Sequence, residues 1–305
     1  MRQLRIKAYA KINLFLDVLY KRSDGYHEIE TVLQSIGLSD DIILRKLSTD
    51  IKIKCEHPQV PLDESNLAYR AAKLILEASS LSEGVEITMK KRIPISAGLG
   101  GGSADAAGVL VGLNQLFELG YEREELMQFG VKLGADVPFC ILGGTALGRG
   151  IGEVLTPLPP IDRIWLVLVN PGFMVSTASV YQNLHARTFN FELTNSKSEN
   201  LGLTKCPKNV NILIQQIQTS NLRKIGNEMF NALEAVVANR YPVIWKLKNQ
   251  LKKFGALGAL MSGSGPTVFA LMPDEFHAKS AAVKLSSETH FCITTTTNSA
   301  GVIIN

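Results

Sequence analysis

The sequence has few cysteines, and none of them lie at the spacing of a metal site. Its 305 residues contain four, namely Cys55, Cys140, Cys206 and Cys292. A chain of this length can bury a core without disulfide crosslinks, and a structural zinc site needs cysteines or histidines a few residues apart. A disulfide-stapled module and a zinc ribbon are therefore excluded, and we expect a reducing compartment.

Long hydrophobic runs are also missing. No uninterrupted apolar stretch approaches the roughly 18 residues that a membrane helix needs. The apolar stretch that begins at Ile12 is interrupted by Asn13 and Asp17, so it makes a poor signal sequence. We expect a cytoplasmic protein with no membrane partner.

Charge of one sign is not in large excess. Lys and Arg number 32 against 28 Asp and Glu, which gives a formal net charge of +4 and a pI of about 8.8. A nucleic-acid binder usually carries a stronger basic footprint, so we expect no nucleic-acid partner. The small excess fits a pocket for anionic small molecules, although a slightly basic solvated surface explains it equally well.

What the sequence does contain is enough apolar residues and length for two domains. Hydrophobic residues make up 46% and charged residues 20%, which is ordinary for a globular protein. A chain of 305 residues exceeds the usual size of one domain. The run TPLPPIDR, residues 156–163, holds three prolines, and we expect it to separate residues 1–158 from residues 159–305.

Hydrophobic periodicity predicts α+β content. Apolar and polar residues alternate from Ile6 to Leu19, as in a strand with one buried face. Further strands are predicted at 29–36, 41–47, 51–55, 85–89 and 165–171, on both sides of the turn 262–267, and at 291–297. Helices are predicted from about residue 66 and at 103–117, 122–133, 222–237, 241–254 and 275–285, with a long loop at 185–209.

The segment PISAGLGGGSADAAG joins a predicted strand to a predicted helix. Gly98, Gly100, Gly101 and Gly102 allow close backbone approach, so successive N–H groups can converge on an anion, and a helix starting near Ser103 adds its unpaired amides. The segment lacks the Gly-Lys-Ser/Thr ending of a P-loop, and Ser103 replaces the third glycine of G-x-G-x-x-G. It therefore indicates a phosphate cradle of another type; a tight turn without a ligand is the alternative.

Two charged residues could belong to a site, but each has a structural explanation. Lys11 and Asn13 leave the same face of the first strand about 7 Å apart, so Lys11 lies either at an exposed edge or in a cleft. Asp136 follows Gly134 and comes shortly before Pro138, which suits a helix N-cap. From the residues alone, the edge lysine and the cap are the favoured interpretations.

Two turns leave similar alternatives. SGSGPT, residues 262–267, is either a hairpin turn or a backbone brace beside the first glycine loop. Tyr26 and His27 follow the first strand, where an exposed pair usually has no function. A tyrosine at a cleft mouth could, however, stack on a base, which contributes about 1–3 kcal/mol per base.

These segments together resemble the GHMP kinase superfamily, named for galactose, homoserine, mevalonate and phosphomevalonate kinases. PISAGLGGGSADAAG is similar to its ATP-binding motif, AYAKINLFLDV to its N-terminal motif and GALMSGSGPTVFAL to its C-terminal glycine motif, and the resemblance spans nearly the whole chain. It implies an α+β, two-domain fold. An N-terminal, ATP-binding domain like ribosomal protein S5 domain 2 (1–158) would precede a ferredoxin-like domain on the substrate side (159–305), with the active site between them.

Within the superfamily, AKINLFL, RSDGYHEIETV and LGADVPFCILGGTALGRGIGE resemble the members that phosphorylate the 2-hydroxyl of 4-diphosphocytidyl-2-C-methyl-D-erythritol, in the non-mevalonate route to isoprenoids. The implied partners are ATP and this cytidine-diphosphate-linked alcohol. Mg²⁺ is expected because phosphoryl transfer from ATP normally uses it. The alternatives are a GHMP kinase for another alcohol, a non-catalytic nucleotide-binding relative, or a decarboxylase on the same scaffold.

The resemblance also assigns the residues that act on ATP. It makes Lys11 and Asp136 the catalytic pair, which reverses the two interpretations favoured above. Ser103 matches one magnesium ligand of some relatives, and no second ligand is predicted. The residues assigned to ATP are Pro94, Ile95, Ser96, Ala97, Gly98, Leu99, Gly100, Gly101, Gly102, Ser103 and Ala104.

The same resemblance assigns the alcohol substrate. Asn13 would contact its methylerythritol end, and Tyr26 and His27 would hold the cytosine ring. Thr177, in PGFMVSTASVY, would lie near the substrate phosphates. No oligomeric state is predicted.

Overall fold

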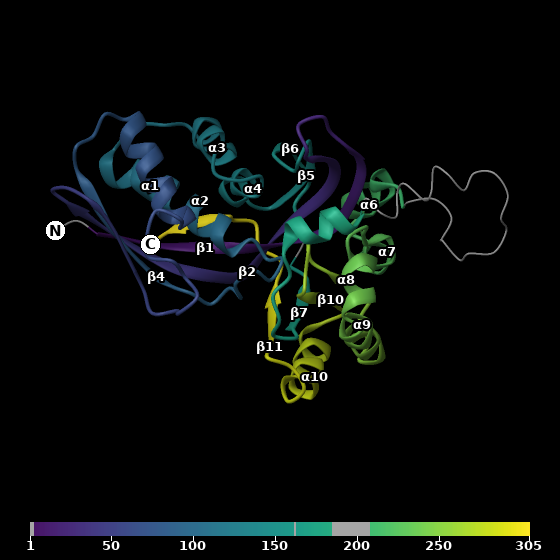
Figure 1. The fold of residues 1–305 in the computed structure, drawn as a ribbon. Coiled ribbons are helices and arrows are strands. Elements are labelled where there is room, and N and C mark those ends of the chain that lie inside the picture. The colour runs from purple at the N-terminus through teal and green to yellow at the C-terminus, as the bar shows by residue number, and fades with distance from the viewer. Residues whose placement is uncertain (1–2, 162, 185–207) are drawn as a thin grey trace.

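The computed structural model describes residues 3–161, 163–184 and 208–305, and its strands form two sheets (Figure 1). Within these residues, eight strands form the first sheet, with the path β12-β1-β2-β4-β3 and with β5, β6 and β8 attached to it. Their bounds are β1 (Gln3–Lys21), β2 (His27–Leu47), β3 (Ile51–Cys55), β4 (Gly84–Lys90), β5 (Thr145–Arg149), β6 (Val154–Pro157), β8 (Phe230–Asn231) and β12 (Val302–Ile304).

Strand β1 explains how polar residues come to be buried in this sheet. Its first part alternates as predicted, with Leu4, Ile6 and Ala8 buried between exposed neighbours. From residue 10 to residue 16 every side chain is buried, because both faces of the strand are covered there. Lys11 therefore does not lie at an exposed edge.

The two strands predicted at 29–36 and 41–47 are wrong as separate elements. The structure has one long strand, β2, which pairs with β1 along nearly its whole length through three register shifts. The polar residues Ser39 and Asp40 lie between the two predicted strands, and both are buried and paired with β1. Tertiary pairing has here overridden the local pattern.

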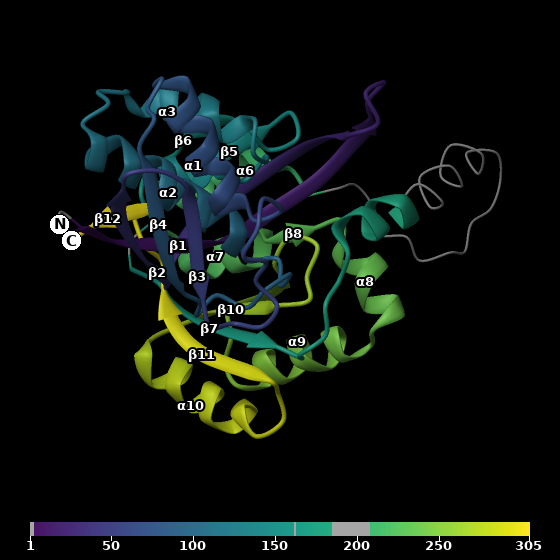
Figure 2. The same ribbon diagram turned by 60° about the vertical axis from the view of Figure 1, so that its left-hand side comes forward.

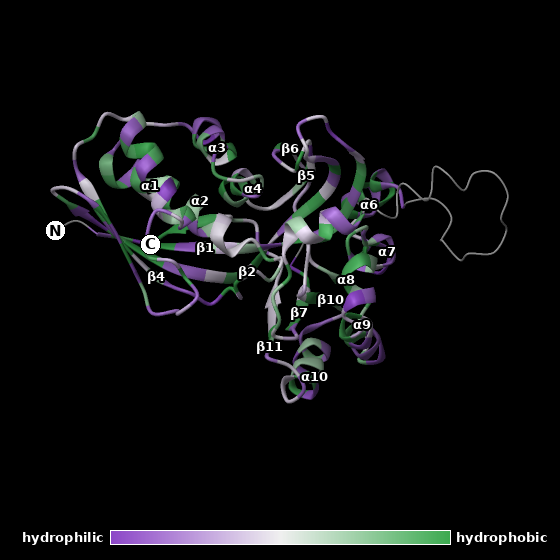
Figure 3. Ribbon diagram, in the orientation of Figure 1, coloured by the Kyte–Doolittle hydropathy of each residue, from purple (hydrophilic) through white to green (hydrophobic). Residues whose placement is uncertain are grey.

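Helices cover one face of the first sheet. They are α1 (Leu67–Ala78), α2 (Gly101–Phe117), α3 (Arg123–Val131) and α4 (Val137–Leu142). α2 lies close to the strands because Gly108 and Gly112 face them: an added Cβ would lie 2.9 Å from Ile42 Cδ1 and 2.3 Å from Ile6 Cδ1, respectively. α1 is amphipathic, with hydrophobic and hydrophilic residues on different faces (Figure 3).

The second sheet has the strand order β11-β7-β10-β9. Its strands are β7 (Trp165–Asn170), β9 (Gly258–Met261), β10 (Val268–Met272) and β11 (Phe291–Thr296), and all neighbours are antiparallel. The helices beyond β7 are α6 (Val210–Gln218), α7 (Leu222–Glu228), α8 (Glu234–Arg240), α9 (Val243–Lys253) and α10 (Glu275–Ser286). The β-α-β-β-α-β sequence in this order is ferredoxin-like, as predicted.

Two expectations for this half of the chain need correction. The single helix predicted at 222–237 is wrong, because β8 and a turn separate α7 from α8. Helix α6 was not predicted at all. The loop predicted at 185–209 lies outside the described residues except for Lys208 and Asn209.

Besides the chain segment between β6 and β7, two strand pairings link the first sheet to later parts of the chain. β8 pairs with β1 in parallel, and β12 pairs with the beginning of β1, so the two ends of the chain lie together (Figure 2). Among the described residues, no helix is long and apolar enough to span a bilayer.

Candidate active site

A cavity of about 660 Å³ lies between the two halves of the molecule. Its wall is formed by β1, the glycine-rich loop before α2, the segment before α4, the helical residues 177–184 and the turn between β9 and β10. The predicted site residues that line it are Lys11, Asn13, Pro94, Ile95, Ser96, Ala97, Gly98, Gly100, Gly101, Gly102, Ser103, Asp136 and Thr177.

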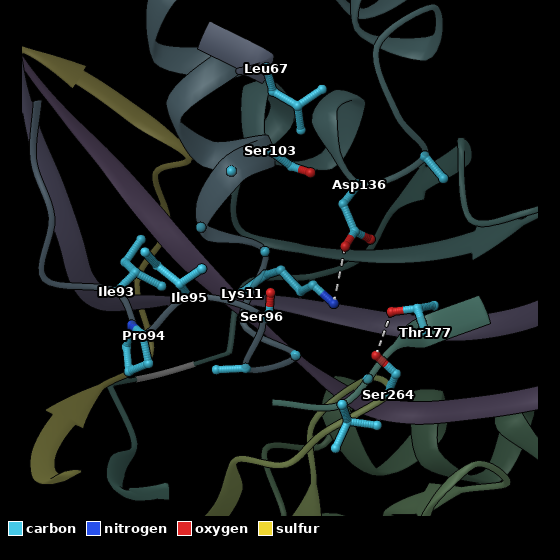
Figure 4. A pocket seen from close by; sticks show the side chains of 18 of the residues that line it. Lys11, Leu67, Ile93, Pro94, Ile95, Ser96, Ser103, Asp136, Thr177 and Ser264 are labelled. Atoms are coloured by element: carbon cyan, nitrogen blue, oxygen red, sulfur yellow. Dashed lines mark hydrogen bonds and ion pairs between the residues drawn. The ribbon is translucent and has the colours of Figure 1, made fainter. Parts of the chain in front are cut away.

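Lys11 and Asp136 meet in the middle of this cavity (Figure 4). The Lys11 Nζ lies 3.3 Å from Asp136 Oδ2. The lysine side chain is 6% exposed and the carboxylate 37%, so the pair is anchored in the protein on one side and open to the cavity on the other. An ammonium and a carboxylate from distant segments thus face the same space.

Asn13 holds the ammonium on its other side. Its Oδ1 accepts a hydrogen bond of 2.9 Å from Lys11 Nζ, while its Nδ2 donates to Thr31 Oγ1. Thr31 in turn donates to the carbonyl of Phe15, which fixes the direction of the whole chain of bonds. The asparagine amide is therefore oriented with its oxygen toward the lysine.

Asp136 occupies the N-cap position of α4, but it does not act as the cap. Its side chain accepts no hydrogen bond from the helix, and its backbone is already helical. The cap interpretation drawn from the residues alone is wrong, because the carboxylate instead turns toward Lys11.

The glycine-rich loop brings backbone amides to the cavity. Gly98 and Gly100 have φ values of +78° and +72°, which residues with a Cβ rarely adopt. α2 begins at Gly101, slightly before the predicted start at Ser103, and its N-cap Gly100 offers no side chain to satisfy the first amides. Those amides have no partner within the helix, so they remain available to an anion.

Two loop residues contribute differently from the others. The side chains of Leu99 and Ala104 are buried in the hydrophobic core and do not line the cavity. The Leu99 carbonyl accepts the backbone N–H of Lys11 at 3.0 Å. Leu99 therefore ties the loop to the strand that carries the lysine.

The turn at residues 262–265 braces the glycine-rich loop. Ser262 Oγ donates to the Gly98 carbonyl at 2.9 Å, and a Cβ added to Gly98 would lie 2.1 Å from the Ser262 carbonyl oxygen. Ser264 shares a 2.7 Å hydrogen bond with Thr177 (Figure 4). Both alternatives that the sequence left open are found, because the segment is the hairpin turn between β9 and β10 and also braces the glycine-rich loop.

The family of this fold is identified by two sequence models. The model for the GHMP kinases N terminal domain matches residues 66–144, and the model for the GHMP kinases C terminal matches residues 213–290. The chain belongs to the GHMP kinase family. It is a small-molecule kinase, and kinases of this family use ATP as co-substrate.

Relatives of this GHMP kinase match nearly its whole length. A protein of Acetivibrio thermocellus named 4-diphosphocytidyl-2-C-methyl-D-erythritol kinase is 44% identical over 97% of this chain and 100% of its own. A protein of the same name from Alkaliphilus metalliredigens is 44% identical over 94% of each chain.

Solved structures agree with this family. The crystal structure of a 4-(cytidine 5'-diphospho)-2C-methyl-D-erythritol kinase superimposes with a TM-score of 0.78 at 33% identity, covering 96% of this chain and 99% of that one. A homoserine kinase of Cytophaga hutchinsonii reaches a TM-score of 0.77 at 20% identity, covering 100% and 98%. The second likeness concerns the fold alone.

Neither Tyr26 nor His27 lines the cavity. Tyr26 is 60% exposed at the tip of the β1–β2 hairpin. The His27 ring stacks on Tyr181 with 5.0 Å between ring centroids, and Tyr181 does line the cavity. Of the two predicted residues, His27 thus reaches the site through Tyr181, a residue that the sequence analysis did not suggest.

Near the glycine-rich loop of this GHMP kinase, three charged side chains form a buried cluster. Lys91 Nζ forms ion pairs with Asp40 and Asp105, and all three side chains are at most 6% exposed. Burial raises the pKa of Asp105 to about 7, against the opposing effect of the Lys91 ammonium. Burial also lowers the pKa of Lys91, but its two carboxylate neighbours outweigh this and raise it overall.

The raised pKa of Asp105 makes stability depend on pH. The protonated carboxyl stabilises the folded state fully below the ordinary carboxyl pKa of about 4, and this contribution is lost as pH rises toward the folded pKa of about 7. We expect the Tm of the wild type to fall by this contribution between about pH 4 and about pH 7, and the Tm of Asp105→Asn to lack this fall. The difference should reach about 2 °C or more, because 1 kcal/mol shifts Tm by about that amount in proteins near this size. Parallel Tm profiles for the two proteins would contradict it.

Several lining residues escaped the sequence analysis. Thr31, Lys91, Asp105 and Tyr181 line the cavity, yet none was assigned a role, although Thr31, Asp105 and Tyr181 lie in the segments RSDGYHEIETV, PISAGLGGGSADAAG and PGFMVSTASVY. Asp105 could have been suspected, because a carboxylate inside an otherwise apolar helix needs a partner. Tyr181 carried no such signal, since tyrosines are common in exposed helices.

Proposed function

We propose that this GHMP kinase transfers the γ-phosphoryl group of ATP to the 2-hydroxyl of 4-diphosphocytidyl-2-C-methyl-D-erythritol, giving the 2-phosphate and ADP. The observation that carries the proposal is the Lys11–Asp136 ion pair of 3.3 Å, placed in a cavity between the glycine-rich loop and Thr177. The names of the relatives that match nearly the whole chain at 44% identity support the choice of alcohol.

Asp136 and Lys11 would act on the acceptor hydroxyl. The carboxylate of Asp136 accepts the hydroxyl proton or aligns it, and general-base assistance of this kind contributes about 10²–10⁴-fold. Lys11, held by Asn13, orients Asp136 and offsets charge on the transferring group. The transition state of phosphoryl transfer is loose, so alignment and charge stabilisation are the main tasks of the protein.

The glycine-rich loop and the start of α2 would hold the ATP phosphates. Their free amides and the positive end of the helix dipole suit an anion. Among the described residues, no group of three or more acidic, histidine or cysteine side chains could hold a metal ion. This fits Mg²⁺, which is usually bound through substrate phosphates, water and one or two protein oxygens, and Ser103 would supply one of them. The ion would neutralise charge on the phosphates.

The cytosine end of the alcohol would lie near Tyr26, His27 and Tyr181. Burial, assisted by the Asp136 carboxylate, raises the pKa of Tyr181 to about 12, so its phenol stays neutral at physiological pH. A neutral aromatic ring that is already stacked on His27 offers a ready surface for a base. Asn13 would contact the methylerythritol end and Thr177 the diphosphate.

Turnover with a panel of alcohols tests the proposal. ADP release from ATP is measured with the cytidyl alcohol, R-mevalonate and homoserine, each against a blank without acceptor. We expect release only with the cytidyl alcohol, because its base and diphosphate occupy the part of the cavity beyond Lys11. Activity with mevalonate or homoserine in its absence would refute the substrate, and no activity with any alcohol would refute the kinase assignment to this site.

A further inference from the structure

Another buried ion pair lies next to the 262–265 turn and has no part in the chemistry proposed above. Glu234, the first residue of α8, pairs with Lys248 of α9, and both side chains are at most 11% exposed. The other carboxylate oxygen, Oε2, accepts the backbone N–H of Met261 at 2.8 Å. Met261 ends β9, immediately before the turn.

Asn231 holds the same turn from the opposite direction. Its side chain is 5% exposed, and its Nδ2 donates to two carbonyls, those of Met261 at 2.7 Å and Gly263 at 2.8 Å. Its Oδ1 accepts the N–H of Leu233 at 2.9 Å. Both N–H groups of the Asn231 amide therefore donate to backbone carbonyls in the turn or directly before it.

The backbone of Asn231 connects this turn to the strand of the reacting lysine. β8 pairs with β1 at Leu16, and the N–H of Ala232 donates to the Leu16 carbonyl at 2.9 Å. At the turn itself, a Cβ added to Gly263 would lie 3.4 Å from both Lys11 Nζ and Asn13 Oδ1. Asn231 thus fixes the distance between β1 and a backbone segment that lies beside the ammonium group of Lys11.

We infer that Asn231 and Glu234 are positioning residues, which hold the 262–265 turn against Lys11 and Asn13 and thereby keep the lysine aimed at Asp136. The inference rests on the proposed function of the Lys11–Asp136 pair. The turn touches Gly98 on one side and Thr177 on the other, so its displacement disturbs the alignment of donor and acceptor rather than removing a contact to either.

The test compares Asn231→Asp with Asn114→Asp. Asn114 makes the same kind of bonds, donating to the Tyr121 carbonyl at 2.9 Å and accepting its N–H at 3.0 Å, but it lies near the end of α2 remote from the cavity. In each variant a carboxylate oxygen replaces the NH₂ group that faced a carbonyl.

Asn231→Asp should lower kcat about a hundredfold, the loss expected for a misplacement near 1 Å, with KM for ATP changed less than about threefold. Asn114→Asp should keep kcat within about twofold of the wild type while losing a similar amount of Tm. Equal kcat in the two variants would overturn the inference.

A second readout does not depend on turnover. Hydrogen exchange of residues 261–266, followed by mass spectrometry, should quicken in Asn231→Asp and stay unchanged in Asn114→Asp. If the wild type fails to phosphorylate the cytidyl alcohol, the proposed function falls, and the exchange result still decides whether Asn231 holds the turn. Unchanged exchange in Asn231→Asp would overturn the positioning role.

Glu234 provides a pair of variants should Asn231→Asp not fold. Glu234→Gln keeps an oxygen for the Met261 N–H, whereas Glu234→Ala removes it, and both lose the ion pair with Lys248 equally. We expect Gln to retain kcat within about threefold and Ala to lose about tenfold, because only the second frees the turn. Equal kcat for the two would contradict the role of this acceptor.

Discussion

Replacement of Asp136 by Asn should lower kcat at least about a hundredfold, with little change in KM for ATP. The amide has the shape of the carboxylate, but it cannot accept the hydroxyl proton and no longer attracts the Lys11 ammonium 3.3 Å away. Any fall in Tm should come from the lost ion pair with Lys11 and not from a lost helix cap, because the Asp136 side chain accepts no hydrogen bond from α4. Steady-state kinetics and a thermal melt measure both effects.

Asp274→Asn is the matched control for this variant. Asp274 is also an N-cap residue, at the start of α10, but its side chain does accept the N–H of His277. Asparagine caps helices about as well as aspartate, so both activity and stability should be kept. An Asp136→Asn enzyme that retains most of its activity would refute the role proposed for this carboxylate.

Replacement of Gly98 by Ala should weaken ATP binding by about tenfold or more, equivalent to about 1.4 kcal/mol. Two costs combine at this position. The φ of +78° is strained for a residue with a Cβ, and that Cβ would lie 2.1 Å from the Ser262 carbonyl oxygen. Because the clash is with backbone, either the glycine-rich loop or the 262–265 turn has to move, and the amides that would hold the phosphates move with it. Calorimetric titration with ATP measures the loss.

Gly120→Ala separates the two costs. Gly120 has a φ of +77°, nearly that of Gly98, but an added Cβ meets nothing within 4 Å. This variant should lose only the stability due to backbone strain, about 1–2 kcal/mol, and bind ATP normally. If Gly98→Ala binds ATP as well as Gly120→Ala does, the close contact between the glycine-rich loop and the 262–265 turn does not contribute to ATP binding.

Local patterns predicted those parts of the fold whose cause lies in neighbouring residues. The alternation in β1, the helix expected at 122–133 and the glycine-rich loop before α2 all depend on backbone preferences and on one buried face. The failures occurred where distant segments decide. β2 continues through Ser39 and Asp40 because β1 supplies partners, and the helix predicted at 222–237 is interrupted because Phe230 and Asn231 pair with β1.

The candidate site shows the same division. The motifs identified Lys11, Asp136 and the loop, but only through resemblance, since a lysine on a strand and an aspartate before a short helix each had a simpler local explanation. The structure contradicts both explanations. Lys11 is buried, and the Asp136 side chain does not cap α4. Tyr181, Lys91 and the Asn231 brace had no local signal, since their partners lie far along the chain.

By itself, then, the sequence determined which segment could bind an anion and which face of the first part of β1 would be buried, because both properties follow from glycine conformations and side-chain periodicity over a few residues. Only the tertiary structure decided which charges meet. An ion pair forms where packing brings two side chains within a few ångströms, and the packing of β1 against α2, α4 and the 262–265 turn placed Lys11, Asp136 and Gly263 together.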